Sequence, residues 1–392
     1  MTTLSSLSVV VIHPLLSSRT GGSVDSHPAP DEGPASLKTE PALTAILHAM
    51  LGKGLGGLEQ VYLDYQPILE AYAAQHGGTA TGVVRSGGKV AAQEAGRMPP
   101  LATMPAYTDW DPVTLGAARR LVAAKAPDLI LSHGQRPARL LARVAPVKAV
   151  LAICVHKPAF DIETTRTHYV CVGQHLADLA IERGVPAQRV HFVPNAVKPP
   201  TALASPFKDG ARAPRIVAAG RLHPKKGFDV LIAALALLRD QDQTFDCEIA
   251  GEGDERARLE GLIAQHGLEG RVRLVGWRAD VSAFLATGDV FAFPSYQEGF
   301  PLVLLEAMAV GLPVASAAIP GPVEMIDSGV DGVLVPPGDP AALAGALAGL
   351  IAAPEKAAAL GLAARAKVLE EYGPESLKRR LDAVLDLMLG RA

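Results

Sequence analysis

The stretch VFAFPSYQEGFPLVLLEAMAVGLPVASA, at residues 290–317, has the pattern of a strand, a loop, a helix and a second strand. Pro301 fits the first position of the helix, where its missing N–H costs nothing and its fixed φ is already suitable. Two strands of one sheet that are joined through a helix run parallel. The stretch therefore predicts an α/β unit with a loop at the carboxyl end of its first strand.

The same alternation of short apolar runs and helical segments continues on both sides of this stretch. In the C-terminal half, the predicted strands are RIVAAG, DCEIAG, RVRLVG, VFAFPS, PVASAA and GVLVPP. In the N-terminal half, they are TAILHAM, TATGVV, DLILSH, AVLAICVH and YVCVG. Because strands that alternate with helices are typical of parallel sheets, we predict two doubly wound, Rossmann-like sheets.

The composition changes at the ends of each series. The first forty residues are rich in Ser, Pro and Gly, and the segment 194–214, between the two series, contains five prolines. We expect the first segment to be dispensable for folding, because it buries too little apolar area to offset the entropy of ordering it. The predicted divisions are a flexible extension at 1–40, an N-terminal acceptor-side domain at 41–198, a linker at 199–213, a C-terminal nucleotide-sugar-binding domain at 214–372 and an amphipathic helix at 373–392.

The whole-chain composition narrows the classes of function. The 392 residues are 49% hydrophobic and 20% charged, with a net charge of −3. These values fit a globular protein of two domains and argue against a nucleic-acid binder, which normally carries a strongly basic face. Three cysteines without a CxxC pair, and the lack of a signal-peptide or membrane-span pattern, predict a cytoplasmic protein. A peripheral contact with the inner face of the membrane stays open, as does the oligomeric state.

The loop and helix after VFAFP predict an anion site. Ligands bind beyond the carboxyl ends of parallel strands, and the amides of Leu302 and Val303 are free donors in the first turn of the expected helix. A diphosphate there would also meet the positive end of the helix dipole. A helix that is simply buried explains the apolar residues but not Glu306, because a buried carboxylate needs a partner.

A basic loop follows another strand, in the segment AAGRLHPKKGFDVLIAAL. Arg221 has the planar fork that clamps phosphate oxygens, and Lys225 or Lys226 supplies a further positive charge. A solvated basic turn is the structural alternative. The position of the cluster at the end of a strand favours phosphate binding.

A glycine-rich loop is a further candidate for ligand binding. Gly52, Gly54, Gly56 and Gly57 lie between the first strand and a helix, where glycines let amides approach a ligand.

The segment GEGDERARL is rejected as a dinucleotide motif, because its acidic pair would repel a pyrophosphate and suits an ordinary helix start.

Two histidines come after strands of the N-terminal series. His133 ends DLILSH and His156 ends AVLAICVH, so each has the position of an acid, a base or a sugar-hydroxyl ligand. A histidine after a strand is more often a structural hydrogen-bonding group. His48 and His223 are weaker candidates.

Together these motifs resemble the retaining glycosyltransferases of family 4, which have the GT-B fold of two Rossmann-like domains facing a central cleft. The resemblance is carried by GRLHPKKG, by EGFPLVLLEAMAVGLPV and, in the N-terminal half, by GLGGLEQ, ICVH and RVHFVPNAV. It implies that Arg221 and Lys226 bind the donor diphosphate and that Glu306 binds the ribose. It further implies a sugar site at Glu298, Gly299, Phe300 and Pro301, a contact of His156 with a sugar hydroxyl, phosphate contacts at Gly56 and Gly57, and a base site at Trp277 and Arg278.

The expected function is transfer of a sugar from a nucleotide-diphosphate donor to a saccharide or lipid-linked acceptor, with retention of anomeric configuration. The residues expected to act in catalysis are His156, Glu298, Lys226 and Arg221. No essential divalent ion or other cofactor is expected, because no Asp-rich site follows the strands and the basic pair can neutralise the leaving group. The alternatives are a sugar-nucleotide epimerase or phosphorylase of similar build and a non-catalytic nucleotide- or glycan-binding protein.

Overall fold

The computed structural model describes residues 44–108, 110–162, 166–208, 210 and 212–391. The predicted N-terminal extension, 1–40, lies outside the described residues. Both sheets belong to one compact unit, which spans Pro41–Ala392.

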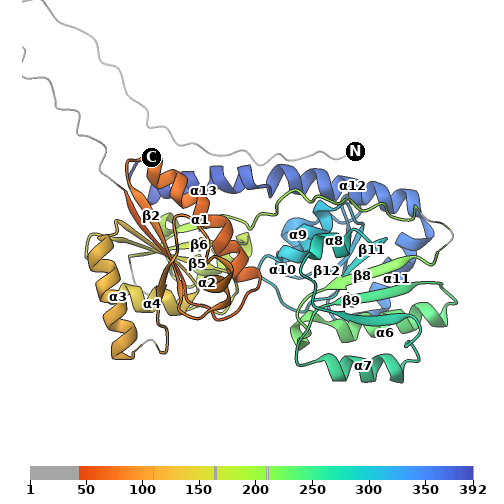
Figure 1. Ribbon diagram of the computed structural model, residues 1–392. Helices are drawn as coiled ribbons and strands as arrows, with labels where there is room; N and C mark the ends of the chain where they lie inside the picture. Colours follow the sequence, from red (N-terminus) through yellow and green to blue (C-terminus); the bar gives the residue numbers. More distant parts are fainter. Residues whose placement is uncertain (1–43, 109, 163–165, 209, 211, 392) are drawn as a thin grey trace, which may run out of the picture. The chain divides into compact units, whose positions relative to one another are not determined.

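The first half of the described chain forms a seven-stranded parallel sheet with the order β3-β2-β1-β4-β5-β6-β7. Its strands are β1 (Ala45–Met50), β2 (Thr79–Arg85), β3 (Ala102–Met104), β4 (Leu129–His133), β5 (Val150–Val155), β6 (Thr167–Cys171) and β7 (Val190–Phe192). The connecting helices are α1 (Gly57–Gln75), α2 (Lys89–Gln93), α3 (Pro112–Lys125), α4 (Gln135–Ala142), α5 (Gln174–Glu182) and the 3-10 helix η1 (Ala187–Arg189). Helices cover both faces of this sheet (Figure 1).

The second half forms a six-stranded parallel sheet with the order β10-β9-β8-β11-β12-β13. Its strands are β8 (Arg215–Ala219), β9 (Asp246–Ala250), β10 (Val272–Gly276), β11 (Val290–Phe293), β12 (Val314–Ala317) and β13 (Val333–Val335). The helices are η2 (Pro224–Lys226), α6 (Phe228–Asp240), α7 (Arg256–Gln265), α8 (Val281–Leu285), α9 (Leu302–Ala309), α10 (Pro320–Met325), α11 (Pro340–Ala352), α12 (Pro354–Glu371) and α13 (Pro374–Met388). The prediction of two Rossmann-like parallel sheets is confirmed.

The two sheets have equivalent strand orders. In each, the chain first adds strands on one side of the initial strand and then crosses to its other side, so that β1 lies next to β4 and β8 lies next to β11. This reversal is the topological switch point, where open parallel sheets bind ligands beyond the carboxyl ends of their strands. The short edge strands β3 and β7 were not expected from the sequence, since each has only three residues.

Burial on both faces explains why the strands are apolar throughout. Along β8, Ile216 and Ala218 pack into one hydrophobic cluster, and Val217 and Ala219 pack into another on the opposite face. A strand covered by helices on both sides has no solvent-facing positions for polar residues. Continuous apolar runs, rather than strict alternation, are the result.

The last helix packs against the first sheet. Helix α13 contacts α1, and Leu377, Leu381 and Leu385 share a buried cluster with residues of β1 and α1. The hydroxyl of Tyr72 on α1 donates a hydrogen bond of 2.6 Å to the Asp386 carboxylate on α13. In the described ranges, no single helix is long and apolar enough to cross a membrane. One pair of helical segments, Pro340–Ala352 and Pro354–Met388, is long and apolar enough when taken together, but the pair is bent by 105°.

Candidate active site

The predicted donor residues follow the two strands at the switch point of the second sheet. Arg221 and Lys226 come after β8, and Glu298 comes after the neighbouring strand β11. The loops that carry them are packed together. The amide of Tyr296 donates a hydrogen bond of 2.8 Å to the carbonyl of Lys225. Gly227 has a φ of 64°, and a Cβ there would lie 2.1 Å from the carbonyl oxygen of Pro294, so the loops fit only with glycine at this position.

This packing sets Lys226 beside Glu298. The Lys226 Nζ donates a hydrogen bond of 2.6 Å to Glu298 Oε1, which also accepts one of 3.1 Å from the Ser295 hydroxyl. The two charged side chains are only 22% and 16% exposed. Arg221 is exposed and forms no ion pair within the described part of the chain. The site thus holds a neutralised pair and one uncompensated cation.

The start of α9 differs by one residue from the expectation. Pro301, expected at the first helical position, is instead the residue before the helix, because its ψ of 115° is extended. Its carbonyl accepts hydrogen bonds from the amides of Leu304 and Leu305 at 3.2 and 3.4 Å. Across the described ranges, the amides of Leu302 and Val303 have no acceptor, so they are available to an anion.

Glu306 is the charged residue of α9, whose other residues are apolar. Its carboxylate is partly buried, and among the described residues it has neither an ion-pair partner nor a hydrogen-bond partner for its side chain. Burial, followed by repulsion from Asp280 and Asp64, raises the pKa of Glu306 to about 7. An unpaired carboxylate in an apolar helix is costly, and such groups occur mainly where they bind ligands.

The glycine loop of the first sheet meets the start of α9. Gly56 is the residue before α1, and Gly57 is its first residue. A Cβ on Gly57 would lie 3.4 Å from Leu302 Cδ1, and one on Gly52 would lie 2.5 Å from Glu59 Oε1. The start of α1 therefore lies beside the Leu302 side chain, and the Glu59 carboxylate on α1 lies beside the loop at Gly52.

The loop that carries Glu298 makes a close backbone contact with His156. A Cβ on Gly299 would lie 2.1 Å from the carbonyl oxygen of His156, so only glycine fits between Glu298 and Phe300. The buried Asn195 donates a hydrogen bond of 2.7 Å from its amide nitrogen to the Phe300 carbonyl. These contacts hold the loop after β11 against the segments that follow β5 and β7.

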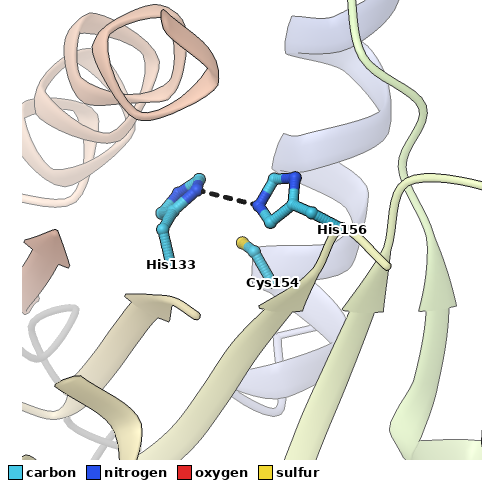
Figure 2. Close-up of side chains that lie close together, drawn as sticks. All are labelled: His133, Cys154 and His156. Atoms are coloured by element: carbon cyan, nitrogen blue, oxygen red, sulfur yellow. Dashed lines mark hydrogen bonds between the residues drawn. The ribbon is translucent and has the colours of Figure 1, made fainter. Parts of the chain in front are cut away.

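His156 belongs to a group of uncharged imidazoles. Figure 2 shows its Nε2 facing His133 Nδ1, with a hydrogen bond of 3.2 Å between them. Burial lowers the pKa of His156 to about 3 and holds that of His133 well below its usual range. Both rings are therefore neutral at physiological pH. A neutral imidazole presents one donor and one acceptor, which suits a sugar hydroxyl.

Arg278 and Trp277 are not joined to the other candidates. They follow β10, which β9 separates from β8, and both side chains are exposed. No hydrogen bond or ion pair connects Arg278 to the other candidate residues within the described ranges.

The segment GEGDERARL supports the basic loop rather than forming a site. A Cβ on Gly251 would lie 1.8 Å from the carbonyl oxygen of Gly220, and one on Gly253 would lie 2.2 Å from that of Leu222. The glycines therefore allow backbone packing. Glu255 precedes α7, as expected for an acidic helix start.

Sequence reasoning missed two polar contacts between the sheets. The sequence indicates Asn195 only as part of RVHFVPNAV, and no motif includes Glu324. The Glu324 carboxylate accepts hydrogen bonds from the amides of Gln174 and His175, at 2.7 and 2.6 Å, and caps the start of α5. Its partners are 149 and 150 residues away, so no local pattern could have identified it.

The chain resembles known glycosyltransferases over part of its length. Residues 206–367 match the family model of glycosyl transferases group 1. The amylovoran biosynthesis glycosyltransferase AmsK of Erwinia amylovora is 36% identical over 215 residues, which make up 53% of this chain and 53% of that protein. The lipopolysaccharide core biosynthesis glycosyltransferase LpsE of Rhizobium meliloti is 37% identical over 142 residues, or 36% of this chain and 41% of that protein. The chain spans about half the length of the curated relatives it matches.

The similarity in structure extends over both sheets. The crystal structure of HepE from Anabaena in complex with UDP matches 88% of this chain and 100% of that chain, with a TM-score of 0.75 and 22% sequence identity. At this identity the match concerns the fold. The fold is the GT-B arrangement of two Rossmann-like domains.

Proposed function

We propose that this protein is a glycosyltransferase that moves a sugar from a nucleotide-diphosphate donor to an acceptor, with retention of anomeric configuration. The observation that carries the proposal is Glu306, a partly buried carboxylate without a partner in a helix whose first amides are free. An unpaired carboxylate near free amides suits a ligand with both hydroxyl and phosphate groups. The match of residues 206–367 to group 1 glycosyltransferases supports the same conclusion.

The donor diphosphate binds at the start of α9. The amides of Leu302 and Val303 donate to its oxygens, and Arg221 and Lys226 neutralise its charge. As the bond from sugar to diphosphate breaks, negative charge grows on the leaving oxygen, and these cations stabilise it. The reaction therefore needs no essential divalent ion.

The nucleoside and the sugar lie on either side of the diphosphate. Glu306 accepts hydrogen bonds from the ribose hydroxyls, while Glu298 and the backbone of Gly299 to Pro301 hold the transferred sugar. The neutral His156 contacts a sugar hydroxyl near the anomeric carbon. Gly56 and Gly57 approach the phosphates, and Arg278 lies near the base.

The acceptor is a saccharide or a lipid-linked saccharide of a cell-surface polysaccharide or lipopolysaccharide. This assignment is supported by the names of the relatives, which include an amylovoran and a lipopolysaccharide core glycosyltransferase.

The product's stereochemistry tests the proposal. We expect an α-linked donor to give an α-linked product, measured by the anomeric coupling constant in NMR after a screen of nucleotide sugars has identified the donor. A β-linked product contradicts retention. Formation of an epimer without an acceptor indicates an epimerase, and binding without turnover indicates a binding protein.

A further inference from the structure

We propose that His133, Cys154 and His156 form a site for a thiophilic metal ion such as Zn²⁺, and that an ion bound there inhibits sugar transfer. The inhibitory part rests on the proposed function, because it requires His156 to contact the donor sugar.

The fold places the three side chains on one side of the first sheet. Strands β4 and β5 are paired so that His133 is opposite Cys154, and His156 lies two residues beyond Cys154. Side chains two residues apart point to the same face of an extended strand. Their nitrogen and sulfur atoms all lie within 4.8 Å of one another, and Figure 2 shows the sulfur directed toward the space between the two rings.

The distance between the rings fits a shared ion. Two imidazole nitrogens bound to one tetrahedral Zn²⁺ are about 3.3 Å apart, given Zn–N bonds of about 2.05 Å. In this protein, His133 Nδ1 and His156 Nε2 are 3.2 Å apart. An ion can therefore replace the hydrogen bond at nearly the same distance between the two nitrogens, provided that each ring turns until its lone pair faces the ion.

The ligand types select a thiophilic ion. One sulfur and two imidazole nitrogens suit Zn²⁺, Co²⁺ and Cu⁺, whereas Mg²⁺ and Ca²⁺ prefer oxygen ligands. On binding, the Cys154 thiol releases its proton to solvent and the thiolate coordinates the ion. The proton of the hydrogen bond between the rings moves to the other nitrogen of the histidine that carries it, so that His133 Nδ1 and His156 Nε2 both have a free lone pair. A fourth position stays open, as in zinc sites that are not purely structural.

Two features indicate reversible binding. Ligating histidines are usually oriented by a hydrogen bond to the second ring nitrogen, but His133 Nε2 is buried and has no partner among the described residues. His133 and Cys154 are each 1% exposed, whereas His156 is partly exposed and provides the route by which an ion reaches the site. An ion there occupies the ring nitrogen that fixes the orientation of His156, so His156 can no longer adjust to a donor sugar.

Cobalt spectroscopy tests the site without reference to activity. The full-length protein, treated with a chelator, is titrated with Co²⁺ and then with competing Zn²⁺. We expect one equivalent to bind, with a thiolate-to-cobalt absorption band and the strong visible bands of tetrahedral Co²⁺. Cys154→Ala should remove the thiolate band and weaken Co²⁺ binding about tenfold or more. Removing a residue that only orients a metal ligand already weakens binding by about this factor, and Cys154 is itself a proposed ligand. His133→Asn should keep the band but weaken binding.

The control is Cys247→Ala, which removes another buried cysteine, on β9. It should bind Co²⁺ as the parent does, and thermal melts of all variants should show that each is folded. An unchanged thiolate band in Cys154→Ala would overturn the proposed site, as would the absence of binding to the parent protein.

Activity then tests the inhibitory part. We expect saturating Zn²⁺ to slow transfer by the parent about tenfold or more and to slow transfer by Cys154→Ala much less, with each protein compared with its own rate without metal. Binding through Cys154 without slower transfer overturns inhibition and removes His156 from the donor site. If the metal-free parent transfers no sugar, the proposed function fails, while the cobalt spectrum still decides the metal site.

Discussion

The two sheets have the same strand order but different side chains at their switch points. After β8 and β11, the second sheet carries Arg221, Lys226 and Glu298, which are charged. At β1 and β4, the first sheet carries His48 and His133, which are buried and whose pKa values are lowered by burial. One topology thus supports a charged site and a neutral one.

The difference follows from how each group is compensated. In the second sheet, Lys226 and Glu298 form an ion pair with each other, and both side chains are mostly buried. In the first sheet, His48 Nδ1 is hydrogen-bonded at 2.8 Å to Gln66 Oε1, and the Gln66 amide donates to Glu70 at 2.8 Å. Burial lowers the pKa of His48 to about 3, although the hydrogen bond to Gln66 acts to raise it, so the ring stays uncharged. The second sheet is therefore suited to a diphosphate and the first to sugar hydroxyls.

The largest expected effect comes from removing one charge of the second sheet. Lys226→Ala should lower kcat by about 10²–10³, the loss seen when one charge-stabilising donor is removed from an active site. Steady-state kinetics measures the effect, and circular dichroism shows whether the variant is folded. Lys225→Ala is the matched control, because Lys225 is the adjacent residue of the same loop and its side chain is exposed.

Lys225→Ala should keep kcat within about threefold of the parent value, as expected for an exposed charge with weak electrostatic effects. If Lys226→Ala turns over at the parental rate, the charged switch point does not bind the leaving group.

The two switch points also differ in how far the sequence predicts them. The sequence indicates Glu306, because a carboxylate within LVLLEAMAV has no structural explanation, and Arg221, because it follows a strand. The hydrogen bond between His133 and His156 joins residues 23 positions apart and depends on the register of β4 and β5. The sequence shows that each histidine ends a strand, but not that the strands are neighbours.

Close backbone contacts were the least predictable part of the site. No local feature of QEGFP requires its glycine, Gly299. Glycine is needed there because a Cβ would collide with the carbonyl oxygen of His156, which follows a strand of the other sheet. The edge strands β3 and β7 and the extended ψ of Pro301 depend likewise on neighbouring segments. Local patterns therefore predicted the parallel sheets and the charged residues, whereas contacts between the sheets required the structure.

The second effect comes from the contact that joins the two regions. Gly299→Ala places a Cβ 2.1 Å from the His156 carbonyl oxygen, so one backbone segment must move. We expect a loss of stability of about 1–3 kcal/mol, the usual cost of overpacking, together with a lower kcat. Thermal melting and kinetics measure both changes.

Gly345→Ala is the control for Gly299→Ala. Gly345 lies exposed within α11, and a Cβ there meets no atom within 4 Å. It should raise stability by about 0.5–1 kcal/mol, because alanine is the better helix former. Equal melting temperatures for the two variants would mean that the contact at Gly299 is not retained in solution.

A smaller effect is expected where the second sheet contacts the unreacting part of the donor. Glu306→Ala should raise the donor KM about tenfold or more, the loss expected for a hydrogen bond to a charged group, and change kcat little. Donor titrations at saturating acceptor separate the two parameters. Normal donor affinity in this variant would place the ribose elsewhere.

A last effect, on stability rather than on kinetics, tests Glu306, the partly buried carboxylate of α9 that has no ion-pair or hydrogen-bond partner among the described residues. Since burial raises the pKa of Glu306 to about 7, the folded protein binds more protons than the unfolded chain between the ordinary carboxyl pKa and that value. Stability contributed by this group is therefore present at low pH, falls as pH rises through this window, and is constant above it.

The substitution Glu306→Gln removes this titration. Without donor, we expect the parent to lose on the order of 2 kcal/mol relative to this variant between pH 5 and pH 8, since one pKa unit corresponds to about 1.4 kcal/mol. Urea unfolding of both proteins at the two pH values measures the difference, and Glu269→Gln, at an exposed carboxylate, serves as the control. If the parent and Glu306→Gln respond equally to pH, Glu306 is compensated in solution, and the unpaired carboxylate no longer distinguishes the second sheet from the first.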